Sequence, residues 1–472
     1  MNRYFAFLLF LIVVSSASAS NPFRIEINGV FPGAEGREIR VMEYGDLISY
    51  RLQEIDAAII DDNGKFSVGF SRFEPQFILF RIDHARMGMF VEPGKNYVLE
   101  FDPVDFDALD DRINPYLNPW RFPFRIIEPE NNLNAYIDQF EEELYGYLSE
   151  HFVLMQLGRN VDVFEGFIQH TDSLFNHIEN EYFQEYYRYK YAYYRRVANL
   201  GRFDDMLREY ILNQPVLYNN TQYMNLFNTV FDKFIFAGSR RIPASDLRHT
   251  VNRLNSYHAL MDSLGKDTIL RNELLRELVM LKGLQDMYND PDYLRPNVVN
   301  IIKHVEENSR FPQHRVIARN ILHQNRYLRE GTSAPSVVVE DHTGNQMRIP
   351  EDFEGRYLYL VFWASWCETC LLDFIALQEI HSKHNDNLTV IGISSDRHQL
   401  NYETFLRNHN HPWEHVHFNN DFRLLDAYHV RALPSFVLID REGKIRGFPA
   451  RRPSEDLITY FEWLLFQERR SR

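Results

Sequence analysis

The only two cysteines of this 472-residue chain stand close together, at Cys367 and Cys370. An apolar run from Tyr357 to Phe362 precedes the pair, and a helical pattern of apolar residues follows it. This arrangement predicts that the pair lies where a buried strand turns into a helix. Cys367 would then lie at the helix N-terminus, where unpaired N–H groups and the helix dipole favour a thiolate.

A cysteine pair at this spacing could serve three purposes. A structural zinc site commonly takes two pairs of ligands, and this chain has no second cysteine pair. A structural disulfide across so short a loop would remove little chain entropy from the unfolded state. A CxxC at a strand-to-helix junction is instead typical of a thioredoxin-like redox site. We therefore predict redox chemistry that needs no metal and no cofactor.

The N-terminus has the features of a secretory signal peptide over residues 1–19. Arg3 supplies a positive charge, Phe5 to Val14 is an unbroken apolar run, and Ala17-Ser18-Ala19 is a typical cleavage site. The run is shorter than the roughly 20 residues of a membrane anchor. No cysteine follows the cleavage site to take a lipid. We expect cleavage after Ala19 and a mature chain in the periplasm or cell envelope that does not span the membrane.

The chain is acidic, with a formal net charge of −15. Affinity for nucleic acid comes mainly from the neutralisation of phosphates, so we expect no nucleic-acid partner. The length predicts several domains, about two to four.

The first domain is predicted over residues 20–103 as an antiparallel β-domain. Short runs such as 23–27 and 66–70 alternate apolar and polar residues, and turn residues such as Glu92-Pro93-Gly94-Lys95 separate them. Regular short strands with such turns are typical of a sandwich or a small barrel.

Residues 104–330 are predicted as a central all-α domain. Pro115, Pro119 and Pro123 predict an extended linker at its start, and helical spacing dominates after it. The run 182–194 within this domain is unusually aromatic. We interpret it as a helix that is buried on most sides. The alternative is a platform that binds sugar or peptide.

Residues 331–472 are predicted as an α/β domain, because buried strands alternate with helical patterns. The strands are expected at 357–362, 388–394 and 435–440, and Ser454 is expected to cap a closing helix that runs to about Phe466. Alternating strands and helices imply a central sheet that is covered on both faces.

Four motifs in this last domain form a recognisable order. They are Phe362-Trp363-Ala364-Ser365-Trp366-Cys367-Glu368-Thr369-Cys370, Gly392-Ile393-Ser394-Ser395-Asp396, Val430-Arg431-Ala432-Leu433-Pro434-Ser435-Phe436-Val437-Leu438-Ile439-Asp440 and Gly443-Lys444-Ile445. With these motifs, residues 331–472 resemble the thioredoxin fold of TlpA/ResA-like thiol–disulfide oxidoreductases. The turns of the first domain resemble those of the small β-domain of unknown function that precedes such envelope thioredoxins.

The resemblance implies roles for individual residues. Cys367 would be the attacking thiol, Cys370 the resolving thiol and Pro434 the cis-proline beside them. The chain departs from the family at Asp373, where a glutamate is usual, and at Ile375, where a proline is usual. Asp373 is either a buried carboxylate that relays the proton of Cys370 or a solvated residue of the first helical turn.

Four further residues are expected to contact the substrate: Trp366, Glu368, Thr369 and Leu433. The segment at Pro434 would pair with the substrate backbone as an added strand. The charge of Glu368 should oppose a very low pKa of the Cys367 thiol. A thiol pair whose reduced form is not specially stabilised favours a reducing couple.

Histidines cluster at residues 409, 411, 415 and 417. A His-x-His pair in a strand places two rings on one face, which is a candidate metal pair. No carboxylate or cysteine supports such a site in the sequence pattern. We therefore interpret these histidines as surface residues of a connecting segment, and we predict no metal site.

The favoured function is the reduction of disulfides in exported envelope proteins by the CxxC pair. The resemblance implies that a membrane thiol carrier donates the electrons. The alternative is a ligand- or partner-binding protein in which the first two domains dominate and the redox domain is accessory. A peroxidase is a weaker alternative, because Ala364 and Ser365 do not supply the threonine usual before a peroxidatic cysteine.

Overall fold

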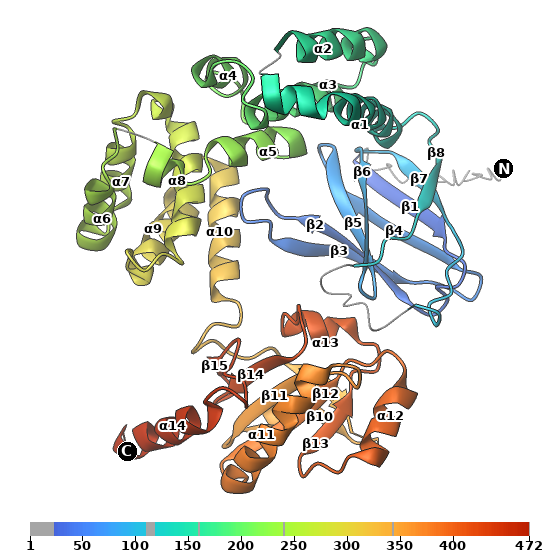
Figure 1. Ribbon diagram of the computed structural model, residues 1–472, viewed down its shortest axis with the longest axis vertical. Helices are drawn as coiled ribbons and strands as arrows, with labels where there is room; N and C mark the ends of the chain where they lie inside the picture. Colours follow the sequence, from blue (N-terminus) through green and yellow to red (C-terminus); the bar gives the residue numbers. More distant parts are fainter. Residues whose placement is uncertain (1–22, 110–118, 159–160, 239–240, 342–343, 472) are drawn as a thin grey trace, which may run out of the picture.

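The computed structural model describes residues 23–109, 119–158, 161–238, 241–341 and 344–471. The predicted signal peptide over residues 1–19 and Pro115 of the predicted linker lie outside these ranges. Figure 1 shows two N-terminal sheets, a helical region beside and above them, and a C-terminal α/β domain below. The multi-domain fold class predicted from the sequence is therefore confirmed.

Eight N-terminal strands form two sheets of four, in the orders β4-β1-β7-β8 and β3-β2-β5-β6. Neighbouring strands are antiparallel, except that β1 and β7 pair in parallel. Both sheets bury aromatic side chains such as Phe31, Phe80 and Phe101 in one core, as in a β-sandwich. The strands are β1 Arg24–Val30, β2 Glu38–Tyr44, β3 Leu52–Ile59, β4 Lys65–Ser71, β5 Gln76–Ile82, β6 Ala85–Val91, β7 Asn96–Phe101 and β8 Phe124–Glu128. We refer to β1–β8 as the sheet pair.

The eighth strand lies outside the range that the sequence analysis assigned to the β-domain. β8 pairs with β7 in antiparallel orientation and packs Phe124 and Ile126 against the core of the sheet pair. The sheet pair therefore continues past residue 103, into the range assigned to the helical domain. The strand is only five residues long and directly follows Pro123, so its local pattern was interpreted as part of a linker.

The helical region begins at Leu133. Its aromatic helix α3 buries Phe183, Tyr186 and Tyr189 among others, which confirms the interpretation of the aromatic run as a buried helix. The α-helices are α1 Leu133–Gly158, α2 Val161–Phe175, α3 Glu181–Val197, α4 Phe203–Tyr210, α5 Thr221–Val230, α6 Ala244–Arg248, α7 Tyr257–Leu264, α8 Glu273–Met287, α9 Arg295–Asn308 and α10 Pro312–Arg326. Shorter helical segments are η1 Phe234–Gly238, η2 His249–Leu254 and η3 Thr268–Leu270.

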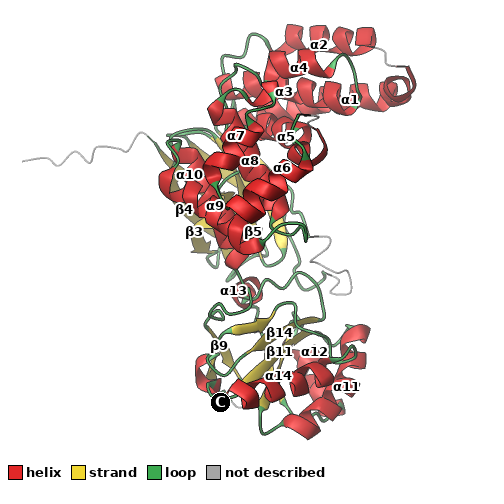
Figure 2. Cartoon of the chain, turned by 90° about the vertical axis from the view of Figure 1, so that its left-hand side faces the viewer, coloured by secondary structure: helices red, strands yellow, loops and turns green. Residues whose placement is uncertain are grey.

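The C-terminal domain has a five-stranded sheet in the order β13-β12-β11-β14-β15, in which β11 is parallel to β12 and antiparallel to β14. Helices α11, α12 and α14 pack on one face, whereas α13 and the β9–β10 pair pack on the other (Figure 2). The elements are β9 Val337–Glu340, β10 Gln346–Ile349, η4 Glu351–Phe353, β11 Tyr357–Trp363, α11 Glu368–His384, β12 Leu388–Ser394, α12 Gln399–Asn408, β13 Glu414–His417, α13 Phe422–Ala427, β14 Ser435–Ile439, β15 Ile445–Gly447 and α14 Leu457–Ser471.

The sheet pair contacts the C-terminal domain through charged and aromatic side chains. Asp426 of α13 accepts hydrogen bonds of 2.8 Å from both Arg40 and Arg81. The guanidinium of Arg397 lies 4.9 Å from the centre of the Trp120 ring. Arg397 lies three residues after the end of β12, at the edge of the sheet where β11 leads into the cysteine pair. The segment before β8, which carries Trp120, therefore lies close to that edge.

Candidate active site

Cys367 and Cys370 are joined by a disulfide at the junction of β11 and α11. Cys367 is the N-cap residue of α11, and its sulfur accepts a hydrogen bond of 3.3 Å from the Cys370 N–H. Cys367 is 5% exposed and Cys370 is fully buried. The N-cap position directs helix N–H groups and the positive end of the helix dipole at the Cys367 sulfur, which favours its thiolate when the pair is reduced.

The four residues that were predicted to contact the substrate surround this pair. Glu368 and Thr369 are exposed in the first turn of α11, and the Thr369 hydroxyl lies 3.5 Å from the Cys367 sulfur. Trp366 and Leu433 are half-buried and pack against the core that contains both cysteines. The Leu433–Pro434 peptide bond is cis, as the resemblance implied.

Asp396 holds the segment that leads into the cysteines, a role that the sequence analysis missed. This buried carboxylate accepts hydrogen bonds from the Ser365 N–H at 2.9 Å and 3.1 Å and from the Ser365 hydroxyl at 2.7 Å. The Ser394 hydroxyl donates a further bond of 2.7 Å. Carboxyl ends of neighbouring parallel strands meet at one edge of a sheet. The position of Asp396 just after β12 could therefore have indicated that it lies near the segment that follows β11.

Asp373 is buried, with 1% exposure, so the interpretation of it as a solvated first-turn residue is wrong. Its carboxylate accepts hydrogen bonds from Arg452 at 2.7 Å and 3.1 Å and from the Ser454 hydroxyl at 2.6 Å. Ser454 also donates its backbone N–H to Asp373, whereas α14 begins only at Leu457. The prediction of Ser454 as the helix cap is therefore wrong, because this serine bonds to α11 instead.

We expect Arg452→Ala to lower the free energy of unfolding by about 2 kcal/mol, because it leaves a buried carboxylate without its cation. The effect is smaller than for a fully buried pair, since the Arg452 side chain is 37% exposed. Urea denaturation measures the change. The matched control is Arg451→Ala, whose side chain makes an exposed ion pair of 3.6 Å with Asp456 and lies 4.7 Å from the centre of the Tyr460 ring, with no buried carboxylate among these contacts. Equal losses in both variants would contradict the assignment.

The histidine cluster does not lie on the surface as a whole. His415 and His417 belong to β13 and are each 6% exposed, so the prediction of surface histidines is wrong for these two. Burial, with a smaller contribution from His411, lowers the pKa of His415 to about 3. His415 lies 5.3 Å from Trp363, ring centre to ring centre. The local sequence pattern of β13 did not indicate that the His415 ring would pack into the core under α11 and α12.

Two exposed apolar side chains lie on the helix that begins at the cysteines. Leu372 is 64% exposed and Ile375 is 71% exposed. Residues three apart share one face of a helix, so they form a small apolar surface five and eight residues after Cys367. Ile375 stands where the family usually has a proline, and α11 is continuous through this position.

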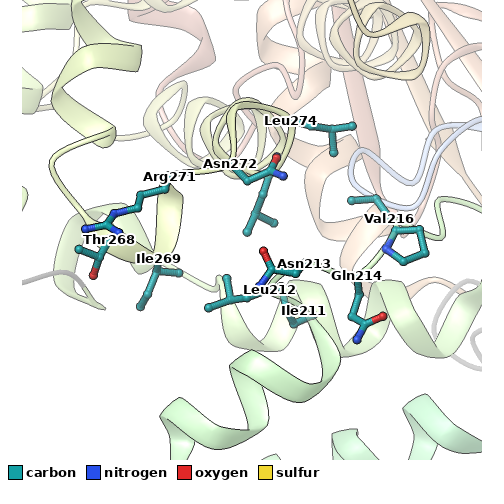
Figure 3. Close-up of a pocket in the computed structure, with 12 residues that line it drawn as sticks. Ile211, Leu212, Asn213, Gln214, Val216, Thr268, Ile269, Arg271, Asn272 and Leu274 are labelled. Carbon is teal, nitrogen blue, oxygen red and sulfur yellow. The ribbon is translucent and has the colours of Figure 1, made fainter.

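The alternative function, ligand binding by the first two domains, would need a suitable cavity, and one cavity lies in the helical region. The cavity has a volume of about 330 Å³ and lies between the segment after α4 and the start of α8 (Figure 3). Arg271 is the only charged residue among those that line it. Asn272 caps α8 by accepting a hydrogen bond from the Leu275 N–H, so this side chain has a structural role. Nothing in this lining points to a specific chemistry.

Comparison with known proteins agrees with this geometry. Residues 355–445 match the family described as Thioredoxin-like. The thiol-disulfide oxidoreductase ResA of Bacillus subtilis (strain 168) is 32% identical over 135 residues, which cover 28% of this chain and 73% of that protein. ResA of Bacillus thuringiensis subsp. konkukian is 26% identical over 134 residues, covering 28% of this chain and 76% of that protein.

Among solved structures, the thioredoxin domain of a thiol-disulfide oxidoreductase from Bacteroides vulgatus is 27% identical. The match covers 29% of this chain and 97% of that chain, with a TM-score of 0.27. The assignment depends on the sequence relatives and on the cysteine pair at the start of α11. By these similarities, the chain belongs to the TlpA/ResA-like thiol–disulfide oxidoreductases with a thioredoxin-like C-terminal domain.

Proposed function

We propose that this thiol–disulfide oxidoreductase reduces disulfides of exported envelope proteins. The observation that carries the proposal is the position of Cys367, whose sulfur caps α11 while its partner Cys370 is fully buried one turn later. The sulfur at the helix N-terminus is the one whose thiolate the helix stabilises, so it is the attacking group. The buried sulfur is accessible to Cys367 rather than to a substrate.

In the reduced enzyme, the Cys367 thiolate attacks one sulfur of a substrate disulfide. A Cys367–substrate disulfide forms, and the other substrate sulfur leaves as a thiolate that takes up a proton. Cys370 then loses its proton and attacks the Cys367 sulfur, which forms the Cys367–Cys370 disulfide and releases the second substrate thiol. The substrate gains two electrons and the enzyme pair loses them. The pair is in this oxidised form in the structure.

Each turnover therefore requires a dithiol donor that returns two electrons to the enzyme. We propose a membrane thiol carrier as this donor. We also propose that Asp373 acts near the resolving step. Among the described residues, its carboxylate bonds to Arg452 and Ser454, and no hydrogen bond joins it to Cys370. We therefore assign it a positioning role, in which it fixes α11 against the segment before α14.

The surface around Cys367 suits a polypeptide substrate. Leu372 and Ile375 expose apolar surface on α11, five and eight residues after Cys367, and a bound polypeptide would bury it. Trp366 and Leu433 border the same site. The backbone at Leu433–Pro434, just before β14, would pair with the substrate chain, as added strands do in other peptide complexes.

We propose that the protein acts in the periplasm or cell envelope after cleavage of residues 1–19 behind Ala19. A positive residue, a short apolar run and a typical cleavage site support export. Within the described part of the chain, no helix combines the length and apolarity that crossing a membrane requires.

The direction of electron flow is tested by equilibration of the full chain with glutathione buffers. We expect a reducing couple, with a potential nearer to about −270 mV than to about −120 mV, the values of thioredoxin and of a strong oxidant. The fraction of oxidised pair is measured by alkylation and mass spectrometry. A midpoint near the oxidising value would show that the enzyme introduces disulfides instead of removing them.

A further inference from the structure

A second cavity lies between the sheet pair, the end of α10 and the C-terminal domain. Its volume is about 710 Å³, and its lining comes from β2, β3, β5 and β6, from α10, and from α13 and the loop after it. Figure 1 shows β2, β3, the lower end of α10 and α13 converging in this area. Five arginines face a single carboxylate, that of Asp426, in this lining. Such an excess of positive charge is unusual in a chain with a net charge of −15.

Three of these arginines lie directly opposite one another in the sheet. Arg40 of β2 pairs with Arg81 of β5, and Arg81 pairs with Arg86 of β6. Like charges directly opposite on neighbouring strands destabilise a sheet. An arrangement of three cations in one row therefore needs negative charge close by.

Asp426 neutralises only part of this row. It accepts hydrogen bonds of 2.8 Å from Arg40 and Arg81, and Arg431 donates to it at 3.3 Å. The buried Nε atoms of Arg81 and Arg86 have no hydrogen-bond partner among the described residues. The Arg81 side chain is only 6% exposed, so water does not easily replace the missing acceptor. The positive charge of the row is therefore only partly neutralised, and an anion in the cavity would place further negative charge beside the guanidiniums that line it.

Neutral groups complete the lining. Burial lowers the pKa of His429, with a smaller contribution from Arg431. Burial also lowers the pKa of His323, with a smaller contribution from Arg51. The neutral form of both imidazoles is therefore favoured. Tyr44 and Tyr50 meet edge to face with ring centres 5.5 Å apart, and they add aromatic side chains to the lining.

We propose that this cavity binds a small molecule that carries two or more carboxylate or phosphate groups. Arginine donates two parallel hydrogen bonds to such groups, and Arg86, Arg51 and Arg431 line the cavity together with Arg40 and Arg81. The volume lies within the range of about 300–1,000 Å³ for small-molecule sites. The proposal does not depend on the direction of the redox reaction.

The position of the site links it to the rest of the chain. A bound anion would contact the sheet pair through Arg81 and Arg86 and the C-terminal domain through Arg431. Arg431 lies three residues before Pro434, in the loop between α13 and β14. Because the ligand binds only the folded arrangement, it stabilises the contact between the two parts.

The test is isothermal titration calorimetry of the full-length oxidised protein with pyrophosphate and with citrate. Acetate at the same ionic strength serves as the monovalent control. We expect saturable binding of one polyanion per chain, together with a higher unfolding temperature, and no such effect of acetate. Pyrophosphate and citrate separate a phosphate ligand from a carboxylate ligand.

The decisive variant is Arg86→Gln, because this side chain makes no hydrogen bond that folding needs. We expect it to weaken binding at least about tenfold, whereas Arg253→Gln on the exposed surface of the helical region leaves binding unchanged. Arg431→Gln is the second variant and removes a cation from the other side of the cavity. Absence of saturable binding, equal effects of acetate, or undiminished affinity in folded Arg86→Gln and Arg431→Gln would each overturn the proposal.

Discussion

Replacing Cys367 by serine is expected to lower the rate of disulfide reduction by about a thousandfold or more, because the attacking thiolate is lost. The hydroxyl of a serine at the same N-cap position remains protonated at neutral pH and cannot form a mixed disulfide. Reduction of insulin by the full chain in the presence of dithiothreitol measures the rate. Circular dichroism confirms that the variant is folded.

The matched control is Cys370→Ser, which retains the attacking thiol. A single turnover with a model disulfide peptide should still release the first substrate thiol at a rate within about tenfold of wild type, because attack depends on the Cys367 thiolate. Continuous turnover should stop at the mixed disulfide. Reversed behaviour, with attack lost in Cys370→Ser and retained in Cys367→Ser, would contradict the assigned roles.

Acidification is expected to begin to destabilise the folded chain near pH 6.5, which is above the pH range in which carboxylates ordinarily titrate. Burial lowers the pKa of His415 and of His84 to about 3, from an ordinary value of 6.5. The unfolded chain therefore binds more protons than the folded chain between pH 6.5 and pH 3, and stability falls as the pH falls through this window. Each histidine should cost about 2 kcal/mol of unfolding free energy by pH 5.

Urea denaturation at pH 7.5, 6 and 5, followed by tryptophan fluorescence, measures this loss. His415→Leu should reduce the loss by about 2 kcal/mol at pH 5, because the ring no longer takes up a proton on unfolding. His249→Leu, at an exposed site of the helical region, is the control and should leave the pH dependence unchanged. Equal pH profiles of wild type and His415→Leu would show that His415 does not contribute.

The local patterns of the sequence were sufficient for the elements that carry the redox site. The apolar run before Cys367 and the helical spacing after it predicted β11 and α11, and Cys367 is the N-cap as expected. Side-chain partners from distant segments were not predictable. Asp373 bonds to Arg452 and Ser454, which are 79 and 81 residues away, and no pattern around Asp373 indicates them.

The same reason applies to the contact between the sheet pair and the C-terminal domain. Arg40 and Asp426 are 386 residues apart, and alternation in β2 predicts only that Arg40 lies on the face opposite to its apolar neighbours. The short strand β8 was missed because prolines before it indicated a linker, and its pairing with β7 is a tertiary contact. The parallel pairing of β1 with β7 likewise depends on the whole sandwich.

The central claim is that Cys367 attacks disulfides of exported proteins and Cys370 resolves the product. The most direct measurement is trapping: the Cys370→Ser variant is incubated under non-reducing conditions with oxidised envelope proteins, and the products are digested and analysed by mass spectrometry. We predict mixed disulfides in which the Cys367 sulfur is joined to cysteines of these proteins, and none with the variant in which both cysteines are serine. Absence of Cys367-linked products from a folded Cys370→Ser protein would contradict the claim.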